Sequence, residues 1–251
     1  MSKENFHEVQ GIPLAYNQHL SKSATVGLMF LGGFASDKEG SKALALESLA
    51  VERGYDFLRF DYLAHGNSGG DFATQGCISR WLTDALAMID TFTRGPQVLI
   101  GSSMGGWLAL LLSKQRPERL KALVGLAAAP DFATDLTPKM LGDAALAQIE
   151  REGVYYAPTP YGPDPYIWTK LLLDDGKEQR ILDGSLTLPC PLHLIQGQQD
   201  PDVPWDHALK ILQTVQAPLI NLSLIADGDH RLSRDQDLDL ICRTVAHYAD
   251  L

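Results

Sequence analysis

Strand-length runs of apolar residues, separated by segments with helical spacing, constrain the fold of this chain more than any other feature. The run at residues 25–31 (TVGLMFL) is almost continuously apolar. Such runs are typical of parallel strands that helices cover on both faces. Further strands are expected at 55–61, 97–101, 120–126, 191–196 and 218–225, and helices at 39–53, 76–92, 105–114, 206–215 and 233–248. The pattern predicts an α/β fold with a twisted, mostly parallel sheet.

Two other segments depart from this alternation. Residues 6–10 and 12–18 flank Gly11, which favours a hairpin at the start of the chain. Residues 131–186 are rich in Pro, Gly and Tyr, with helices expected at 138–151 and 167–174. We interpret this second segment as a helical cap inserted into one domain that spans residues 1–251. Right-handed crossovers would bring the carboxyl ends of the parallel strands to one edge, where ligands bind.

Composition excludes several classes of function. A net charge of −10 would repel the phosphates of a nucleic acid. No apolar run approaches the roughly 20 residues that span a bilayer. The first residues have no apolar signal region, so a cytoplasmic location is expected. The three cysteines, Cys77, Cys190 and Cys242, match no metal-ligand spacing and are expected to be reduced, and no metal or organic cofactor is implied.

A G-x-S-x-G sequence at residues 101–105 marks the candidate nucleophile. It follows the strand VLI and precedes the helix WLALLLSK, which is the context of a nucleophile elbow. Ser103 has glycine two residues before it and two residues after it, whereas Ser102 has Ile100 and Met104 at those positions. Glycines are needed there because side chains would collide with the neighbouring backbone in so tight a turn. The spacing therefore selects Ser103.

An elbow serine needs a base and a carboxylate that orients the base, in the chain order Ser, Asp, His. Asp200 follows the strand that ends near Gly197, and His230 follows the strand that ends near Ile225, so both belong to the edge that carries Ser103. Asp202 shares the loop and stays open as an alternative carboxylate. His65 is a candidate substrate contact. The other histidines are expected to be packing or surface residues: His7, His19, His193, His207 and His247.

Backbone amides are the expected ligands of the oxyanion. The amide of Met104 follows the nucleophile and opens a helix, whose N-terminal N–H groups are free. A second donor is expected after the strand at 25–31, where Gly32 and Gly33 let the backbone approach a substrate; we predict the amide of Phe34. Substrate contacts are expected from Gly33 and from the cap aromatics, with Tyr155, Tyr156 and Trp168 as candidates; Tyr161 and Tyr166 belong to the same aromatic set.

Together these segments resemble the α/β-hydrolase superfamily. More narrowly, they resemble a family that contains a mitochondrial palmitoyl-protein thioesterase, active also on acyl glucuronides, and bacterial carboxylesterases. The resemblance rests on residues 33–37 (GFASD), 42–47 (KALALE), 59–62 (RFDY), 101–107 (GSSMGGW), 203–205 (VPW) and 229–231 (DHR). It implies hydrolysis of small carboxylic esters or thioesters by Ser103, Asp200 and His230. Gly32 stands where many members of the superfamily have His.

The predicted function is therefore that of a serine hydrolase, with a carboxylesterase acting on short to medium acyl chains as the first choice. Acyl-protein thioesterase and acyl-glucuronide esterase activities are the alternatives. A peptidase or a carbon–carbon hydrolase would use the same three residues. A binding module without catalysis is a different class, and the presence of serine, carboxylate and histidine in the required order argues against it.

Overall fold

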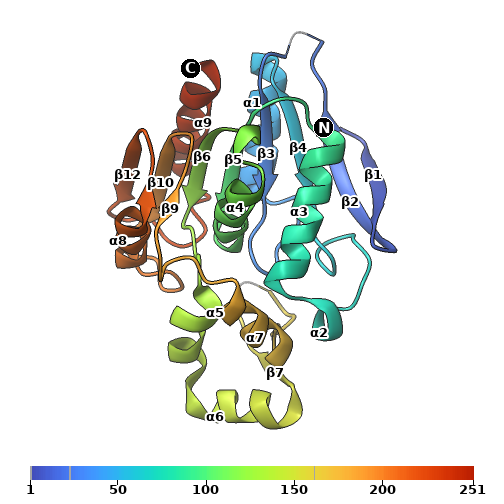
Figure 1. Ribbon diagram of the computed structural model, residues 1–251, viewed down its shortest axis with the longest axis vertical. Helices are drawn as coiled ribbons and strands as arrows, with labels where there is room; N and C mark the ends of the chain where they lie inside the picture. The colour runs from blue at the N-terminus through green and yellow to red at the C-terminus, as the bar shows by residue number, and fades with distance from the viewer. Residues whose placement is uncertain (1, 23, 161) are drawn as a thin grey trace.

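An eight-stranded sheet forms the centre of the computed structural model, which describes residues 2–22, 24–160 and 162–251 (Figure 1). Its strand order is β1-β2-β4-β3-β5-β6-β10-β12. Only β1 and β2 run antiparallel to their neighbours, as expected for an N-terminal hairpin. The strands are β1 (Glu4–Val9), β2 (Ile12–His19), β3 (Gly27–Leu31), β4 (Asp56–Phe60), β5 (Gln97–Ser102), β6 (Leu120–Leu126), β10 (Leu192–Gly197) and β12 (Ile220–Ile225).

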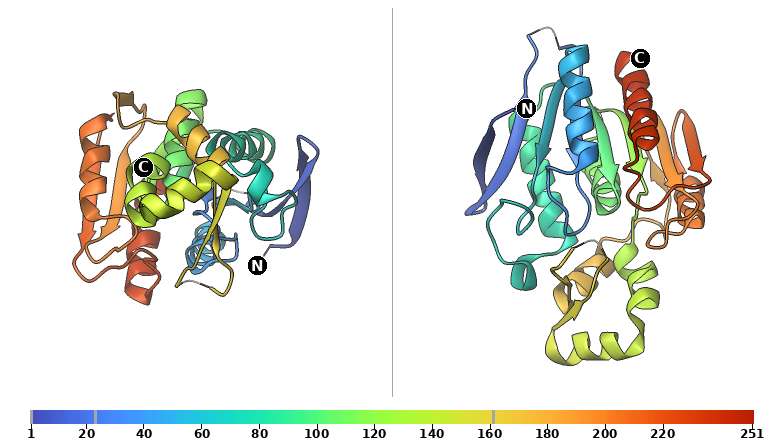
Figure 2. Two further views of the ribbon diagram at one scale, coloured as in Figure 1. Left: turned by 90° about the horizontal axis from the view of Figure 1, so that it is seen from below. Right: turned by 180° about the vertical axis from the view of Figure 1, so that it is seen from behind.

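Helices cover both faces of the sheet, because the central strands β3 and β5 are buried at every position. One face packs against α3 (Ile78–Phe92), α4 (Met104–Gln115) and α8 (Trp205–Thr214), and the other against α1 (Ser41–Arg53) and α9 (Asp235–Asp250) (Figure 2). Each face has its own apolar core, centred on Trp81 and Trp107 on one side and on Leu46 and Val245 on the other. The predicted α/β-hydrolase architecture is confirmed. None of the helices in the described ranges is long and apolar enough to cross a membrane.

Most of the segment between β6 and β10 lies beyond the carboxyl ends of the parallel strands, below the sheet in Figure 1, and its last part returns alongside β10. It contains α5 (Phe132–Asp135), α6 (Thr137–Glu152), β7 (Val154–Ala157), β8 (Tyr166–Thr169), α7 (Lys170–Glu178) and β9 (Leu186–Thr187). Short elements elsewhere are α2 (Phe72–Gln75), the 3₁₀ turn η1 (Pro117–Arg119) and β11 (Val215–Gln216), which pairs with β9. We keep the name cap for residues 131–186.

One expectation for the cap was wrong. Residues 167–174 do not form a single helix: β8 pairs antiparallel with β7, and α7 begins only at Lys170. The aromatic and β-branched side chains at residues 166–169 (YIWT) favour an extended backbone. Thr169 then starts the helix, because its side chain accepts a hydrogen bond of 3.0 Å from the amide of Leu172. The other expected cap helix is present as α6.

Candidate active site

Ser103 lies at a sharp turn between β5 and α4. Its backbone has φ 52° and ψ −116°, a combination that a non-glycine residue adopts only when its surroundings enforce it. Three hydrogen bonds hold the turn: the amide of Ser103 donates to Leu126 O at 2.9 Å, and its carbonyl accepts from Gly106 at 2.9 Å and from Ala129 at 3.1 Å. The candidate nucleophile is therefore fixed to β6 and to the loop that follows it.

The two glycines that flank Ser103 are sterically required. A Cβ on Gly101 would lie 2.4 Å from Gly105 O, and a Cβ on Gly105 would lie 2.0 Å from Leu31 O. Atoms of a folded protein do not approach so closely, so neither position accepts a side chain. The contact of Gly105 with Leu31 also brings the N-terminus of α4 against the end of β3, where the candidate oxyanion loop begins.

His230 is bonded to Asp200. The Nδ1 of His230 donates to Oδ2 of Asp200 over 2.8 Å, and the Asp200 carboxylate is buried. Asp200 comes from the loop after β10 and His230 from the loop after β12, neighbouring parallel strands that bring both loops to one edge. A donating Nδ1 leaves the proton-free Nε2 as the basic nitrogen of a neutral imidazole.

Asp202 contacts the Asp200 carboxylate through its backbone amide. Its amide donates to Oδ1 of Asp200 at 2.9 Å, next to the amide of Val203 at 2.8 Å, while Gln196 Nε2 donates to Oδ2 at 3.0 Å. With the bond from His230, four donors point at the Asp200 carboxylate. Asp200, Asp202 and His230 offer ligand atoms within 4.8 Å of one another, the spacing of a possible metal site. However, the four donors already use the lone pairs that a cation would need.

Two cavities meet at Ser103 and His230. One, of about 320 Å³, is largely polar; its walls include the residues of the loop after β3 together with Lys42, Arg231 and Ser233. The other, of about 80 Å³, is largely apolar, with walls from Phe132, Leu136, Met140, Trp168 and Val203 among others. Phe34 and Tyr166 belong to both walls. A substrate carbonyl at Ser103 would thus have a polar space on one side and an apolar one on the other.

The loop after β3 lies directly against Ser103. A Cβ on Gly33 would be 3.4 Å from the Ser103 Cβ, and both Gly33 and Phe34 line the polar cavity. The next two amides along the loop are already used: Ala35 donates to His65 Nε2 at 3.1 Å and Ser36 donates to Gly33 O at 3.3 Å. Phe34 is therefore the residue of this loop whose amide we retain as the candidate oxyanion donor, with Met104 at the first turn of α4.

The cap supplies two aromatic rings to the cavity walls: Trp168, which was an expected candidate, and Tyr166, from the same aromatic set. Trp168 lines the apolar cavity and stacks on Phe34 with ring centres 4.8 Å apart, while Tyr166 meets Phe34 edge-on at 5.5 Å. Tyr155 and Tyr156, the other two candidates, line neither of the two cavities at Ser103. Tyr156 lies on the opposite face of the β7–β8 ribbon and is 53% exposed. Tyr155 is paired with Trp168 and shares its face of the ribbon. Tyr161 lies outside the described residues.

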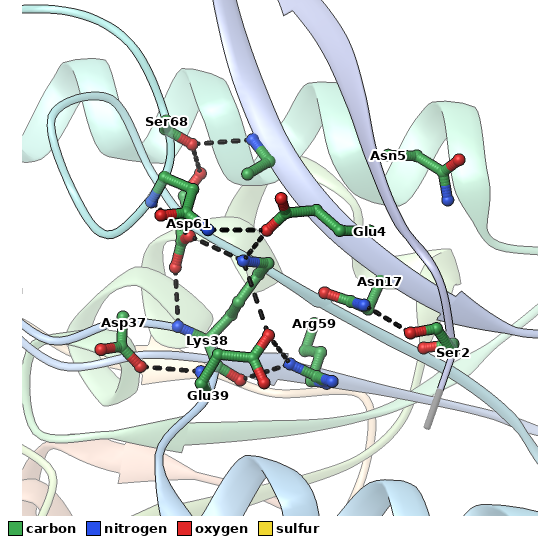
Figure 3. Close-up of polar contacts among 12 residues, drawn as sticks. Ser2, Glu4, Asn5, Asn17, Asp37, Lys38, Glu39, Arg59, Asp61 and Ser68 are labelled. Atoms are coloured by element: carbon green, nitrogen blue, oxygen red, sulfur yellow. Dashed lines mark hydrogen bonds and ion pairs between the residues drawn. The ribbon is translucent and has the colours of Figure 1, made fainter.

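Sequence reasoning gave no role to the charged residues behind the loop. Lys38 is buried and its Nζ reaches Glu4 at 2.6 Å and Asp61 at 3.2 Å (Figure 3). Arg59 pairs with Glu47 at 2.9 Å. Lys38 also donates its amide to Asp61 Oδ1 at 2.6 Å. Burial raises the pKa of the Asp61 carboxyl, and hydrogen bonds from Asn67 and Lys38 oppose that shift. This network fixes the far end of the loop to β4, and it accounts for two of the segments on which the resemblance rests.

Lys42 and Arg231 were also named only as parts of the resemblance. Lys42 is on the first turn of α1 and its Nζ donates to the carbonyl oxygen of Arg231, the residue after the candidate base. Burial, and then the positive charge of Arg231, lower the pKa of the Lys42 ammonium to about 8. The polar cavity therefore has two cationic side chains in its wall, with Asp37 as an acidic one.

The chain is similar in sequence and fold to several known hydrolases. A family model described as serine aminopeptidase S33 matches residues 29–151. The mitochondrial palmitoyl-protein thioesterase ABHD10 of Mus musculus is 32% identical over 238 residues, which is 94% of this chain and 79% of that protein. A solved structure of the mouse α/β hydrolase domain-containing protein 10 is 30% identical, with a TM-score of 0.89 over 99% of each chain.

A second solved structure, from Agrobacterium vitis S4, carries only a provisional description as a hydrolase. It is 38% identical, with a TM-score of 0.93 over 99% of this chain and 98% of that one. The esterase Est1E of Butyrivibrio proteoclasticus, solved with ferulic acid, has a TM-score of 0.78 at 22% identity, which shows a shared fold. Sequence identity and fold thus lead to the same group of proteins. The chain is a hydrolase and belongs to the α/β-hydrolase family that contains the ABHD10 palmitoyl-protein thioesterases.

Proposed function

We propose that this hydrolase cleaves carboxylic esters and thioesters of short to medium acyl groups, with Ser103 as nucleophile, His230 as base and Asp200 as the carboxylate that orients the base. The observation that carries the proposal is the meeting of a strained elbow serine and a carboxylate-bound imidazole at the walls of the same two cavities. A serine, a histidine and a carboxylate arranged in this way perform acyl transfer on several unrelated folds.

The chemistry follows from these positions. His230 Nε2 accepts the proton of Ser103 Oγ while Oγ attacks the acyl carbon, and Asp200 stabilises the imidazolium through Nδ1. The amides of Phe34 and Met104 donate to the oxyanion of the tetrahedral intermediate. His230 then returns the proton to the leaving oxygen or sulfur, and the acyl group stays on Ser103. Water, deprotonated by the same nitrogen, releases the acid and regenerates the hydroxyl group.

The two cavities give the substrate an orientation. The acyl group fits the apolar cavity between Trp168 and Phe132, and the leaving alcohol or thiol fits the polar cavity beside Lys42 and Arg231. An apolar volume of about 80 Å³ is small beside the roughly 300–1,000 Å³ of drug-sized sites, which favours short acyl groups. Thioesters are included because the ABHD10 relatives are named as palmitoyl-protein thioesterases.

One observation favours a second substrate class. Lys42 and Arg231 belong to the wall of the leaving-group cavity, so an ester whose leaving group carries a carboxylate would gain an ionic contact there. Acyl glucuronides are esters of this kind. The cytoplasmic location expected from the sequence stays a prediction.

Labelling with a fluorophosphonate tests the nucleophile. We expect one covalent adduct in the intact mass of the wild-type protein and none in Ser103→Ala. Ser48→Ala is the matched control, because Ser48 is exposed on α1, where its hydroxyl donates to Leu44 O. Undiminished labelling of Ser103→Ala would contradict the assignment. A panel of matched ester, thioester and amide substrates then separates an esterase from a thioesterase and from a peptidase.

A further inference from the structure

The loop that carries the candidate oxyanion donor contains a residue in an unfavourable backbone conformation. Ala35, directly after Phe34, has φ +51°. A left-handed alanine is strained and persists only where its surroundings hold it. The side chain of Ala35 is a single exposed methyl group, so the backbone contacts of Ala35 must supply the restraint. The orientation of the peptide groups on either side of Phe34 depends on them.

His65 makes a hydrogen bond that restrains the backbone of Ala35. Its Nε2 accepts a hydrogen bond of 3.1 Å from the amide of Ala35, and its Nδ1 lies 3.0 Å from the carbonyl oxygen of Leu63. A carbonyl oxygen can only accept and an amide N–H can only donate. The two bonds together are therefore satisfied by one form of the ring alone: the neutral imidazole with its proton on Nδ1.

The surroundings of His65 favour that neutral form. The ring is 3% exposed and packs against Tyr62, Phe72 and Trp81. Burial lowers the pKa of the imidazole to about 4, although the bond to Leu63 O opposes the shift. Trp81 Nε1 donates to the same carbonyl oxygen at 3.1 Å, which fixes the oxygen that in turn orients His65.

Phe34 rests on the same aromatic group. Its ring meets Phe72 at 5.4 Å and Trp81 at 6.1 Å, both edge-on. His65 thus holds the backbone after Phe34, while the rings that surround His65 hold the side chain of Phe34. The other end of the loop is bound to Asp61, which belongs to the same segment after β4 as His65 (Figure 3).

We propose that His65 is a positioning residue for the oxyanion hole: by accepting the Ala35 amide, it aims the amide of Phe34 at the oxyanion that forms on Ser103. This inference rests on the proposed function. His65 neither touches the substrate nor transfers a proton; it acts through the Phe34–Ala35 backbone. Since the oxyanion develops only as Ser103 attacks and is absent from the bound substrate, the loss of His65 would lower kcat and leave KM almost unchanged.

Substitution of His65 by Gln or by Asn distinguishes the effects of its two hydrogen bonds. In His65→Gln the side-chain oxygen can take the place of Nε2 and accept from Ala35. In His65→Asn the shorter side chain can reach Leu63 O, as Nδ1 does, but not Ala35. Both substitutions put an uncharged amide into the same apolar surroundings. We therefore expect similar losses of stability, and a difference in kcat between the two variants reports on the bond to Ala35.

We expect kcat of His65→Asn to fall about 100-fold, the usual effect of losing one oxyanion donor, with KM within about threefold of wild type. His65→Gln should keep kcat within about tenfold. Inhibition by a trifluoromethyl ketone, which forms a tetrahedral adduct, should weaken in parallel with kcat. Thermal unfolding should shift by a similar amount in both variants.

The outcomes distinguish this inference from the function on which it rests. If the wild-type protein forms no adduct with a fluorophosphonate, the proposed nucleophile is wrong and the inference fails with it. If the wild-type protein reacts and both variants have equal kcat, the nucleophile stands and the positioning role of His65 is overturned. The positioning role is also overturned if the loss of kcat in His65→Asn is accounted for by a lower melting temperature of that variant than of His65→Gln.

Discussion

Asp200 and His230 are joined by a hydrogen bond of 2.8 Å although they are 30 residues apart in the chain. The bond forms because β10 and β12 are parallel neighbours and each strand ends immediately before the loop that carries one of the two residues. Asp200 is fixed by its other three donors, so it orients the imidazole rather than following it. The pair is therefore organised before any substrate binds.

The first prediction separates the two aspartates of this loop. Asp200→Asn should lower kcat by up to about 10,000-fold, because an amide favours the wrong imidazole tautomer. Asp202→Asn should stay within about tenfold of wild type, because Asp202 contributes its backbone amide, which the substitution keeps. Steady-state kinetics on a p-nitrophenyl ester measures both. A larger loss in Asp202→Asn than in Asp200→Asn would contradict the assignment.

The second prediction concerns the metal alternative at Asp200, Asp202 and His230. Because four donors already saturate the Asp200 carboxylate, dialysis against a chelator should leave kcat/KM unchanged. Added Zn²⁺ should inhibit if it acts at all, since it competes for the base. Activity that falls with the chelator and returns with a divalent cation would show that these residues hold a metal.

Much of this site follows from the sequence, and the physical reason is local. A tight strand-to-helix turn requires glycine at positions 101 and 105, and the apolar strands before Asp200 and His230 bring both to one edge. The lengths and order of the apolar segments are enough to predict the positions of these residues, and no knowledge of side-chain packing is needed.

The rest depends on contacts that no local pattern records. The aromatic residues at 155–168 predict that rings lie near the site, but the register of β7 and β8 decides that Tyr156 lies on the face opposite to Tyr166 and Trp168, whose rings contact Phe34. His65 was considered only as a substrate contact. Its partner is the backbone amide of Ala35. Because almost every residue type has a backbone amide, the identity of residue 35 does not indicate this hydrogen bond.

The third prediction uses the buried His65 as a pH sensor of stability. The pKa of its imidazole is about 4 in the folded chain, against an ordinary value of 6.5. Between these two pH values the unfolded chain binds more protons than the folded chain, so the free energy of unfolding falls as the pH drops from 6.5 towards 4. The stabilising contribution of the neutral His65 is fully present above pH 6.5. The contribution lost by pH 4.5 is about 2 kcal/mol.

Urea unfolding of the wild type and of His65→Gln at pH 7 and pH 4.5 measures this contribution. All other groups titrate in both proteins, so the difference between the two pH dependences isolates His65. We expect the wild type to lose about 2 kcal/mol more than the variant on acidification. Equal losses would mean that His65 is not held in its neutral form by the fold.

The fourth prediction concerns Lys42 and acidic leaving groups. Because the pKa of Lys42 is about 8, its charge is present at pH 7 and is lost on raising the pH to 9. An ester with a carboxylate in its leaving group should be preferred over an uncharged isostere by about fivefold at pH 7, a typical effect of one partly exposed ion pair. The preference should shrink by pH 9. Taking the ratio of the two kcat/KM values cancels the titration of the catalytic base.

Lys42→Met should abolish both the preference and its pH dependence. Lys114→Met is the control, because Lys114 is exposed at the end of α4, away from the site. A preference that survives in Lys42→Met would assign the recognition to Arg231 alone or to the loop backbone, and a preference for the uncharged ester would contradict the anionic substrate class.

The last prediction is that the apolar cavity limits the length of the acyl group. Its volume is about 80 Å³, and its wall includes Trp168, which is almost fully buried and stacks on Phe34. Each buried methylene contributes about 0.8 kcal/mol, so kcat/KM should rise about fourfold per carbon until the chain meets Trp168 and then fall. Trp168→Ala should move the maximum to longer acyl chains, because it removes the ring of Trp168 from the cavity wall. Tyr156→Ala should leave the profile unchanged, since Tyr156 is 53% exposed on the other face of the ribbon. Hydrolysis of p-nitrophenyl esters from acetate to palmitate measures all three profiles. A wild-type maximum at palmitate would contradict the short-acyl proposal and would favour a long-chain thioesterase whose cap opens to admit the substrate.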